Sequence, residues 1–578
     1  MPDSAPTDPI LALVHEGWEH LKRQRPIAAW ASWRRALRLE PEQPAATHAL
    51  HVLVNAGDLP LAARAEYRFL PPATEERRGR WDACFRGRDL DQLAVAAGAF
   101  ASLADDDPTD TQARFNQGIC LAWLGRNAEA IAALDLAVRA MAELEPELAT
   151  DAWTLAEILR QGGGAETLAD DLNHVITFAW LPGDDPSGFL DTRGDVRPIA
   201  NPIDPVTGRP ELSEARLYEW LVRDWEDGGD LRKLRGTLVR LPGSLRISGT
   251  DPVLLEEIFA EVSHQTIGRV ASVRRQATPL PLAFLDAAVW AIRMAPGLDE
   301  EARSRLNRLA VERYYEVVWI TRPRQGLDGR TPIEAGRLAM EGDAVARVKL
   351  EAVVRVREQL GLRPTTASLY QGYPFDRLRR RLGLAPTDPE AIDPLDAASM
   401  SGPELDKLDP EALDDYNLAD AYESAAALGD DARTARFASV LAGRDPTSLT
   451  RLDRRALFAT LICRSLSIES TEEAMAWLDR AQEVDRVLNG GRDLKTYETW
   501  RAEVYVRVGE PVRAVEVYQE LVEDPADPPL ALDAAETLID AGYEAEARTL
   551  AQRAIDLAEP LGDLEVIDRA KSYLLGDR

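Results

Sequence analysis

The sequence has few of the residues from which disulfide frameworks and metal sites are built. Its 578 residues include three cysteines, Cys84, Cys120 and Cys463, and six histidines. The cysteines lie far apart and form no CxxC pair, so the sequence indicates neither a disulfide framework nor a zinc site. This usage fits a reducing compartment, and we expect a cytoplasmic protein.

Long apolar runs are also missing. No stretch approaches the roughly 20 consecutive apolar residues that span a bilayer, so we expect no membrane partner. The first residues, Met1-Pro2-Asp3-Ser4, lack the basic start and the apolar stretch of a signal peptide. We therefore expect that this sequence carries no secretion signal.

Basic residues are outnumbered, with 68 Lys and Arg against 98 Asp and Glu and a net charge of −30. Residues 1–180 carry −10, residues 181–390 carry 0 and residues 391–578 carry −20. An acidic chain repels phosphate, which argues against a nucleic-acid partner. Two acidic arms thus flank a neutral centre. Residues 231–390 come to +7, so attraction could bring the arms onto the centre within one chain.

Catalytic signatures are absent as well. The sequence contains no GxxxxGK[ST], HExxH or GxSxG motif. Gly162-Gly163-Gly164 lies between helical segments and is interpreted as a loop rather than a phosphate cradle. His48 and His51 could share a helical face, but nothing nearby completes a metal site. We predict no catalytic, cofactor-binding or metal-binding residue, and we expect that the protein is not an enzyme.

The strongest positive signal is self-similarity. In residues 497–525, one apolar helix ends at Gly509 and a second apolar helix follows before Pro525. The next unit repeats this order with its glycine at Gly542, which is 33 positions after Gly509. Glycine ends a helix because it adopts the left-handed conformation at little cost. A helix pair buries only one face, so such pairs must stack on their neighbours.

The same order occurs in the N-terminal arm, around Trp33 and Gly125. Degraded copies cover residues 44–74, 90–108, 411–446 and 452–485. The pattern resembles the tetratricopeptide repeat superfamily over more than half of the chain. The resemblance implies right-handed solenoids that hold a peptide or a partner domain on their concave face.

Some members of that superfamily bind acidic chaperone tails through a clamp of Lys, Arg and Asn. Here one asparagine offers such a side chain, but the neighbouring repeats supply no matching set, and the comparable C-terminal positions are aromatic or acidic. A clamp is therefore not expected, and a basic or mixed partner suits the acidic arm. The candidate partner-binding residues are Asn116, Trp500, Glu503, Asp533 and Glu536.

The centre has a different character. Residues 181–212 are rich in Pro, Gly and Asp and are expected to form a loop or linker. Residues 213–384 are expected to be mostly helical, with one small β-hairpin around Pro242-Gly243. The basic residues of 231–248 are interpreted as an internal counter-charge to the acidic arms, with nucleic-acid contact as the alternative. Residues 385–410 are expected to be a Pro/Asp-rich linker to the C-terminal repeats.

One segment of the centre is similar to another family. Residues 319–356 resemble the C-terminal domain of antitoxins of the Xre/MbcA/ParS type through the string W-x-x-x-P-x-x-x-L-x-G-x-T-P-x-E-A. The resemblance implies a helical segment that contacts a partner toxin. The alternative is that the string is a common helix start, with Thr331 as the cap. The candidate contact residues are Trp319, Arg322, Arg324, Asp328 and Arg330.

Together these patterns predict an all-α protein. Two tetratricopeptide-like solenoid arms, residues 1–180 and 411–578, flank the central domain, and a capping helix ends the second arm. The predicted function is a non-enzymatic scaffold that binds a protein or peptide partner. Two alternatives are a regulator whose central domain binds a toxin-like or nucleic-acid-associated partner, and an enzyme with an unrecognised central domain. The Ala, Arg and Asp usage suggests a bacterial source.

Overall fold

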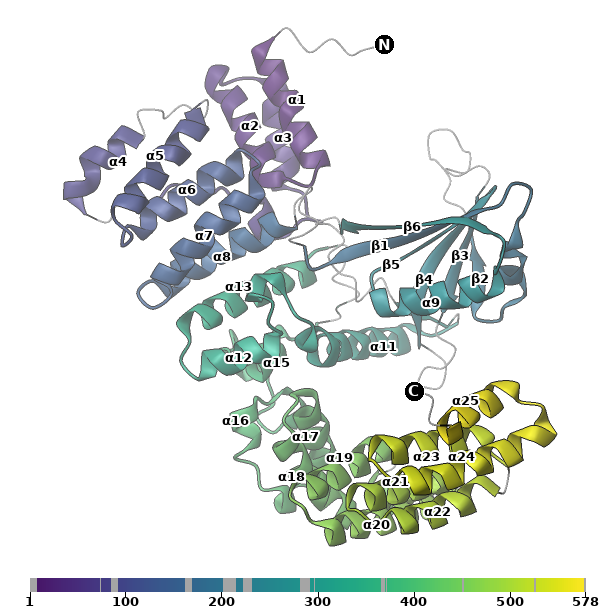
Figure 1. The fold of residues 1–578 in the computed structure, drawn as a ribbon. Helices are drawn as coiled ribbons and strands as arrows, with labels where there is room; N and C mark the ends of the chain where they lie inside the picture. The colour runs from purple at the N-terminus through teal and green to yellow at the C-terminus, as the bar shows by residue number, and fades with distance from the viewer. Residues whose placement is uncertain are drawn as a thin grey trace. The chain divides into compact units, whose positions relative to one another are not determined.

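A computed structural model describes most of the chain (Figure 1). The chain divides into two compact units, Met1–Ala391 and Ile392–Arg578, and each is considered by itself. The described residues are 8–72, 74–84, 92–161, 169–200, 215–221, 231–280, 292–295, 297–364, 370, 372–449, 452–523 and 526–575.

The N-terminal unit contains a helical array (Figure 1, purple to teal). Its helices are α1 (Pro9–Lys22), α2 (Pro26–Leu39), α3 (Pro44–Val54), α4 (Arg78–Cys84), α5 (Leu93–Asp106), α6 (Thr111–Trp123), α7 (Asn127–Met141), α8 (Pro146–Arg160), α11 (Glu300–Arg313), α12 (Pro332–Met340), α13 (Ala344–Gly361) and α15 (Phe375–Arg381). The turn η1 (Leu61–Arg64) follows α3, and the π-helical turn η7 (Tyr314–Val318) follows α11. Helices α5 to α8 pack in chain order, and α13 then packs on α8 and on α12. The array is therefore continuous in space although α8 and α13 are far apart in sequence.

The C-terminal unit is a stack of helix hairpins (Figure 1, green to yellow). Its elements are η11 (Ala397–Ser399), α16 (Gly402–Leu405), α17 (Asp415–Ala427), α18 (Asp431–Gly443), α19 (Arg454–Ser467), α20 (Thr471–Asn489), α21 (Leu494–Arg507), α22 (Pro511–Glu523), α23 (Pro528–Asp540), α24 (Glu544–Ala558) and α25 (Leu564–Leu575). From α17 onward each helix packs on the next one along the chain. Fully buried alanines such as Ala438 and Ala535 let the helices approach closely, while Tyr497 and Tyr518 fill wider gaps. The expected helix pairs are confirmed in this unit.

Among the described residues, seven helix hairpins share one turn. In each hairpin, a residue with a left-handed backbone lies two positions before the second helix. These residues are Gln24, Gly125, Gly342, Gly429, Glu469, Gly509 and Gly542, and Gly562 takes the same position before the terminal helix α25. Glycine avoids the steric cost that other residues meet there, which explains why it occupies most of these positions. Gly342 shows that α12 and α13, which we assigned to the central domain, form a hairpin of the same kind.

An antiparallel sheet is inserted between α8 and α11, so the expectation of an all-α fold is wrong for the centre (Figure 1). The strand order is β2-β3-β4-β5-β1-β6, and β7 pairs with β4. The strands are β1 (Leu172–Trp180), β2 (Val196–Ile199), β3 (Arg216–Leu221), β4 (Leu231–Leu241), β5 (Ser244–Gly249), β6 (Val270–Pro279) and β7 (Ile292–Met294). Helix α9 (Pro252–Gln265) covers one face, where Ile258 packs among Phe178, Trp220 and Ile247.

Several expected ranges change accordingly. Strand β1 lies inside residues 1–180, which we expected to be helical repeats, and β2 lies inside the expected loop 181–212. The expected hairpin around Pro242-Gly243 is present as β4 and β5, but it is part of the larger sheet. Residues 385–410 contain short helical turns, including α16, rather than an extended linker. None of the described helices combines the length and the apolar character that crossing a bilayer requires.

Three basic residues of the hairpin pair with carboxylates of the same sheet region. Lys233 contacts Asp251 at 3.2 Å, and Arg240 contacts Asp185 at 2.7 Å. Arg235 pairs with two glutamates of α9, at 2.8 and 2.9 Å. The pairing is therefore internal, but these partners belong to the sheet region itself and not to the acidic arms that we had expected.

The shared turn can be tested at Gly509, where a Cβ would find space but the backbone φ is +83°. We expect Gly509→Ala to lower the free energy of unfolding by about 1–2 kcal/mol, because alanine is strained in the left-handed region. Glu469 has φ +60° at the equivalent turn. Glu469→Gly is therefore expected to change stability by less than about 0.5 kcal/mol, since relief of strain offsets the added flexibility of glycine. Urea unfolding of both variants checks this, and an equal loss in both would contradict it.

Candidate functional site

The shared turn aligns the first helices of the C-terminal hairpins. Measured back from each left-handed residue, positions six and nine fall on one face of each first helix, because residues three apart are neighbours on a helix. We call this row of side chains the first-helix stripe. It consists of Asp420, Glu423, Thr460, Cys463, Trp500, Glu503, Asp533 and Glu536. The four C-terminal residues that we predicted to bind a partner all belong to it.

Three of the four predicted residues face solvent to different degrees. Glu503 and Asp533 are exposed, and Trp500 is half-buried, with its ring edge-on to Tyr497 at 5.4 Å. Surrounding protein removes part of the hydration of Glu503 and raises the pKa of its carboxyl group.

The fourth predicted residue, Glu536, is engaged within the unit. Its carboxylate pairs with Arg569 at 2.6 Å and accepts a hydrogen bond from the Tyr573 hydroxyl at 2.8 Å, both from α25. Helix α25 thus ends the stripe by neutralising its last carboxylate.

Asn116, predicted as a partner-binding residue, is fully buried instead. Its side chain accepts the Leu70 backbone N–H at 2.8 Å and donates to the Leu70 carbonyl at 3.0 Å. The segment after η1 therefore takes the place that we had assigned to a partner.

The residues predicted to contact a toxin-like partner are buried or engaged in ion pairs within the unit. Trp319 is fully buried, and Arg324 is 3% exposed. Arg322 contacts Asp251 at 3.1 Å, while Asp328 pairs with Lys349 at 2.7 Å and with Arg139 at 3.3 Å. Arg330 is exposed and lies 3.9 Å from Asp328. The segment therefore holds the sheet, α7 and α13 together, so these side chains are not arranged as a free contact surface.

The helix start predicted at Thr331 is confirmed. Thr331 accepts the Glu334 backbone N–H at 3.2 Å, and Glu334 accepts the Thr331 backbone N–H at 2.8 Å. This reciprocal capping box begins α12.

A buried ionic cluster lies where β1 meets the helices. Asp171 pairs with Arg324 at 3.3 Å and with Arg357. Although burial would raise its pKa, these two guanidinium groups hold the pKa of Asp171 below its usual range. Asp170 accepts the Gln325 backbone N–H at 2.7 Å, and burial together with the charge of Glu157 raises its pKa to about 6.

This cluster predicts opposite effects for two neighbouring substitutions. Because Asp170 has a raised pKa, its ionised form weakens the folded state above pH 6, and this penalty fades as the pH falls toward 4. Asp170→Asn keeps an acceptor for Gln325 and is expected to raise the free energy of unfolding by about 2 kcal/mol at neutral pH. Asp171→Asn is expected to lower it by about 3 kcal/mol, because two buried arginines each lose an ionised carboxylate partner.

Urea unfolding followed by tryptophan fluorescence at several pH values measures both effects. The gain from Asp170→Asn should shrink as the pH is lowered through 6. A gain that does not depend on pH, or two substitutions that act in the same direction, would contradict the assignment.

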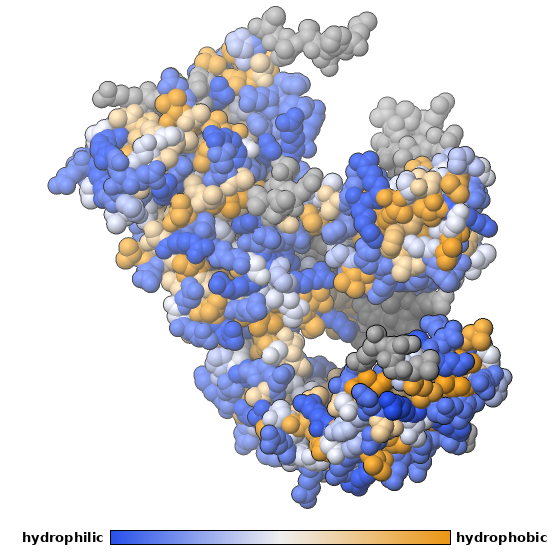
Figure 2. All heavy atoms as spheres, in the orientation of Figure 1, coloured by the Kyte–Doolittle hydropathy of each residue, from blue (hydrophilic) through white to orange (hydrophobic). Residues whose placement is uncertain are grey.

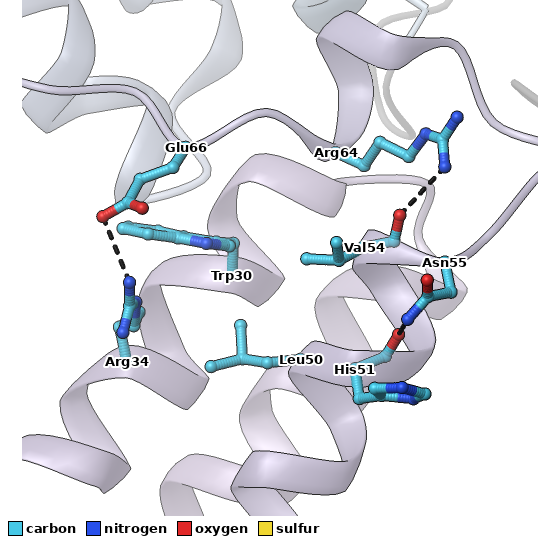
Figure 3. Close-up of a pocket in the computed structure, with 8 residues that line it drawn as sticks. All are labelled: Trp30, Arg34, Leu50, His51, Val54, Asn55, Arg64 and Glu66. Atoms are coloured by element: carbon cyan, nitrogen blue, oxygen red, sulfur yellow. Dashed lines mark hydrogen bonds and ion pairs between the residues drawn. The ribbon is translucent and has the colours of Figure 1, made fainter.

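The N-terminal arm contains an open pocket of about 480 Å³ that the sequence did not reveal (Figure 3). Helix α2 supplies Trp30 and Arg34, α3 supplies Leu50, His51 and Val54, and the following segment supplies Asn55, Arg64 and Glu66. The three apolar side chains line one region of the pocket, and the polar side chains stand around it (Figure 3). The sequence did not predict the pocket because its residues come from three separate elements, and no local sequence pattern shows how these elements pack together.

Trp30 is fixed in place by its neighbours. One contact is a stacking arrangement with Trp123, with ring centroids 5.8 Å apart. The Arg34 guanidinium lies 5.2 Å from the Trp30 ring and pairs with Glu66 at 3.1 Å. Within the described residues, His51 and the rest of the chain form no group of three or more His, Cys, Asp or Glu that could hold a metal ion.

Comparison with known proteins finds no matching family model and no matching curated protein. The yeast Tom70 crystal structure aligns with 98% of this chain and 96% of its own, at 12% identity and a TM-score of 0.20. The crystal structure of the P58(IPK) TPR domain aligns with 87% of this chain and 99% of its own, at 12% identity and a TM-score of 0.17. At these TM-scores the likenesses do not establish a shared overall fold. The hairpins and the shared turn are the basis for the function proposed below.

Proposed function

We propose that the protein is a non-enzymatic scaffold that binds a partner protein through the first-helix stripe. The observation that carries this proposal is the alignment of the exposed residues Glu503 and Asp533 on successive first helices by one repeated turn. Stacked hairpins bury the faces between helices and leave such a row available to a partner. The tetratricopeptide-like sequence pattern supports the same role.

The partner surface is proposed to be basic. Residues 391–578 carry a net charge of −20, and hydrophilic side chains predominate on the visible face of this unit (Figure 2). Complementary charge accelerates association and disfavours wrong partners more than it adds affinity. A cytoplasmic location is also proposed, because a reducing compartment would keep the exposed thiol of Cys463 free.

Cys463 provides a direct test. It lies within the stripe and is exposed, whereas the other two cysteines are buried. A thiol-reactive photo-cross-linker should therefore attach at Cys463 and trap the partner from a lysate of the source organism for identification by mass spectrometry. The purified partner should then bind the full chain, and Glu503→Lys should weaken binding about tenfold by placing like charges together.

Glu520→Lys is the matched control. Glu520 is exposed on α22, outside the stripe, and the substitution makes the same charge change. Binding should stay within about twofold of the unmodified protein. Equal weakening by both variants, or cross-links that form equally well from a cysteine placed at residue 520 in a C463S chain, would refute the stripe as the binding surface.

A further inference from the structure

The N-terminal pocket has an apolar region that is open to solvent. Trp30, Leu50 and Val54 line it, and Val54 is 50% exposed although it is a β-branched apolar side chain. Removing such surface from water contributes about 25 cal/mol per Å². An apolar group from another molecule would therefore be stabilised here, and the fixed orientation of Trp30 means that little order is lost on binding.

The charges around the pocket do not cancel. Arg34 is neutralised by Glu66 at 3.1 Å. Arg64 instead donates to the Val54 carbonyl at 2.9 Å, and no carboxylate among the described residues pairs with it. Its Nε–H is buried and has no acceptor. The Arg64 residue is half-buried overall, so its guanidinium can form a charge-assisted hydrogen bond with an incoming carboxylate.

We propose that this pocket binds a peptide segment in which a large apolar side chain lies next to an aspartate or glutamate. The apolar side chain would pack against Trp30, Leu50 and Val54, and the carboxylate would pair with Arg64. This site is positively charged within an arm of net charge −10, so it selects a partner of opposite chemistry to that proposed for the first-helix stripe.

The openness of the pocket favours a peptide over a small molecule. Pockets for small ligands usually enclose about 70–90% of the ligand surface. Here the lining residues His51, Asn55 and Glu66 are exposed to solvent, so the pocket would not enclose a small ligand (Figure 3). A side chain projecting from a longer chain can enter such a site while its backbone crosses the rim.

A selection of random peptides displayed on phage tests this inference on the full chain. Peptides should be selected on the unmodified protein and depleted on Val54→Asp, which puts a carboxylate at the apolar wall. We expect enrichment of an apolar residue adjacent to Asp or Glu. For one synthesised peptide, replacing its acid by the amide should weaken binding about tenfold, as loss of a charge-assisted hydrogen bond predicts.

Val52→Asp is the matched control, because Val52 is also on α3 and 38% exposed but does not line the pocket. It should bind the selected peptide within about twofold of the unmodified protein, while Val54→Asp should bind at least about tenfold more weakly. Circular dichroism should show the same thermal transition for both variants.

Three results would overturn the inference: no enriched peptide, an enriched motif with Lys or Arg in place of the acid, or equal binding to the two aspartate variants. Glu503→Lys should leave peptide binding unchanged. The result for the N-terminal pocket is therefore independent of the result for the first-helix stripe, and either proposal can be refuted without the other.

Discussion

Helix α8 relies on a helix that follows it much later in the sequence. The chain leaves the helical array after α8 to build the sheet, and α13 later returns to pack against α8. Trp153 lies in this contact: its indole N–H donates to the Gly326 carbonyl at 2.8 Å, and Lys349 lies 4.2 Å from the ring centroid. Without α13, the apolar side of α8 would face water and the inserted sheet would have no second anchor.

The charges at this contact make the arrangement specific. Asp135 of α7 and Asp328 both pair with Lys349, while Asp171 at the start of β1 pairs with Arg357. Buried charges are tolerated only when they are paired. If the sheet packed on the helices in a different position, Lys349, Arg357 and their carboxylates would lose these partners. These carboxylates of the N-terminal arm therefore pair with the centre inside the N-terminal unit, whereas Glu503 and Asp533 of the first-helix stripe are exposed.

The sequence predicted the features that are encoded locally. Gly509 and Gly542 located the hairpin turns, and Thr331 located the start of α12, because caps and turns depend on a few adjacent residues. The sheet was missed because β1 pairs with β5 and β6, whose residues lie about 70 to 100 positions later, and its short apolar run did not separate strand from helix.

The candidate sites show the same division between local and distant information. Repeat spacing identified Glu503 and Asp533 as comparable positions, and both lie on first helices of hairpins that share the same turn. It could not foresee that Asn116 would be occupied by Leu70 or that Arg324 would be buried, because both partners come from distant segments. The pocket around Trp30 also depends on packing between separate elements.

The insertion has a consequence for biosynthesis. Trp153 and Gly326 are 173 residues apart, so α8 emerges from the ribosome long before the segment that covers it. The apolar side of α8 stays exposed to solvent, and the sheet stays without its support from α13, until α13 has been translated. The C-terminal hairpins instead find their neighbours within a few tens of residues and can form as they appear. The first half of this chain is therefore the part that completes its fold late and has the greater need of protection from aggregation during translation.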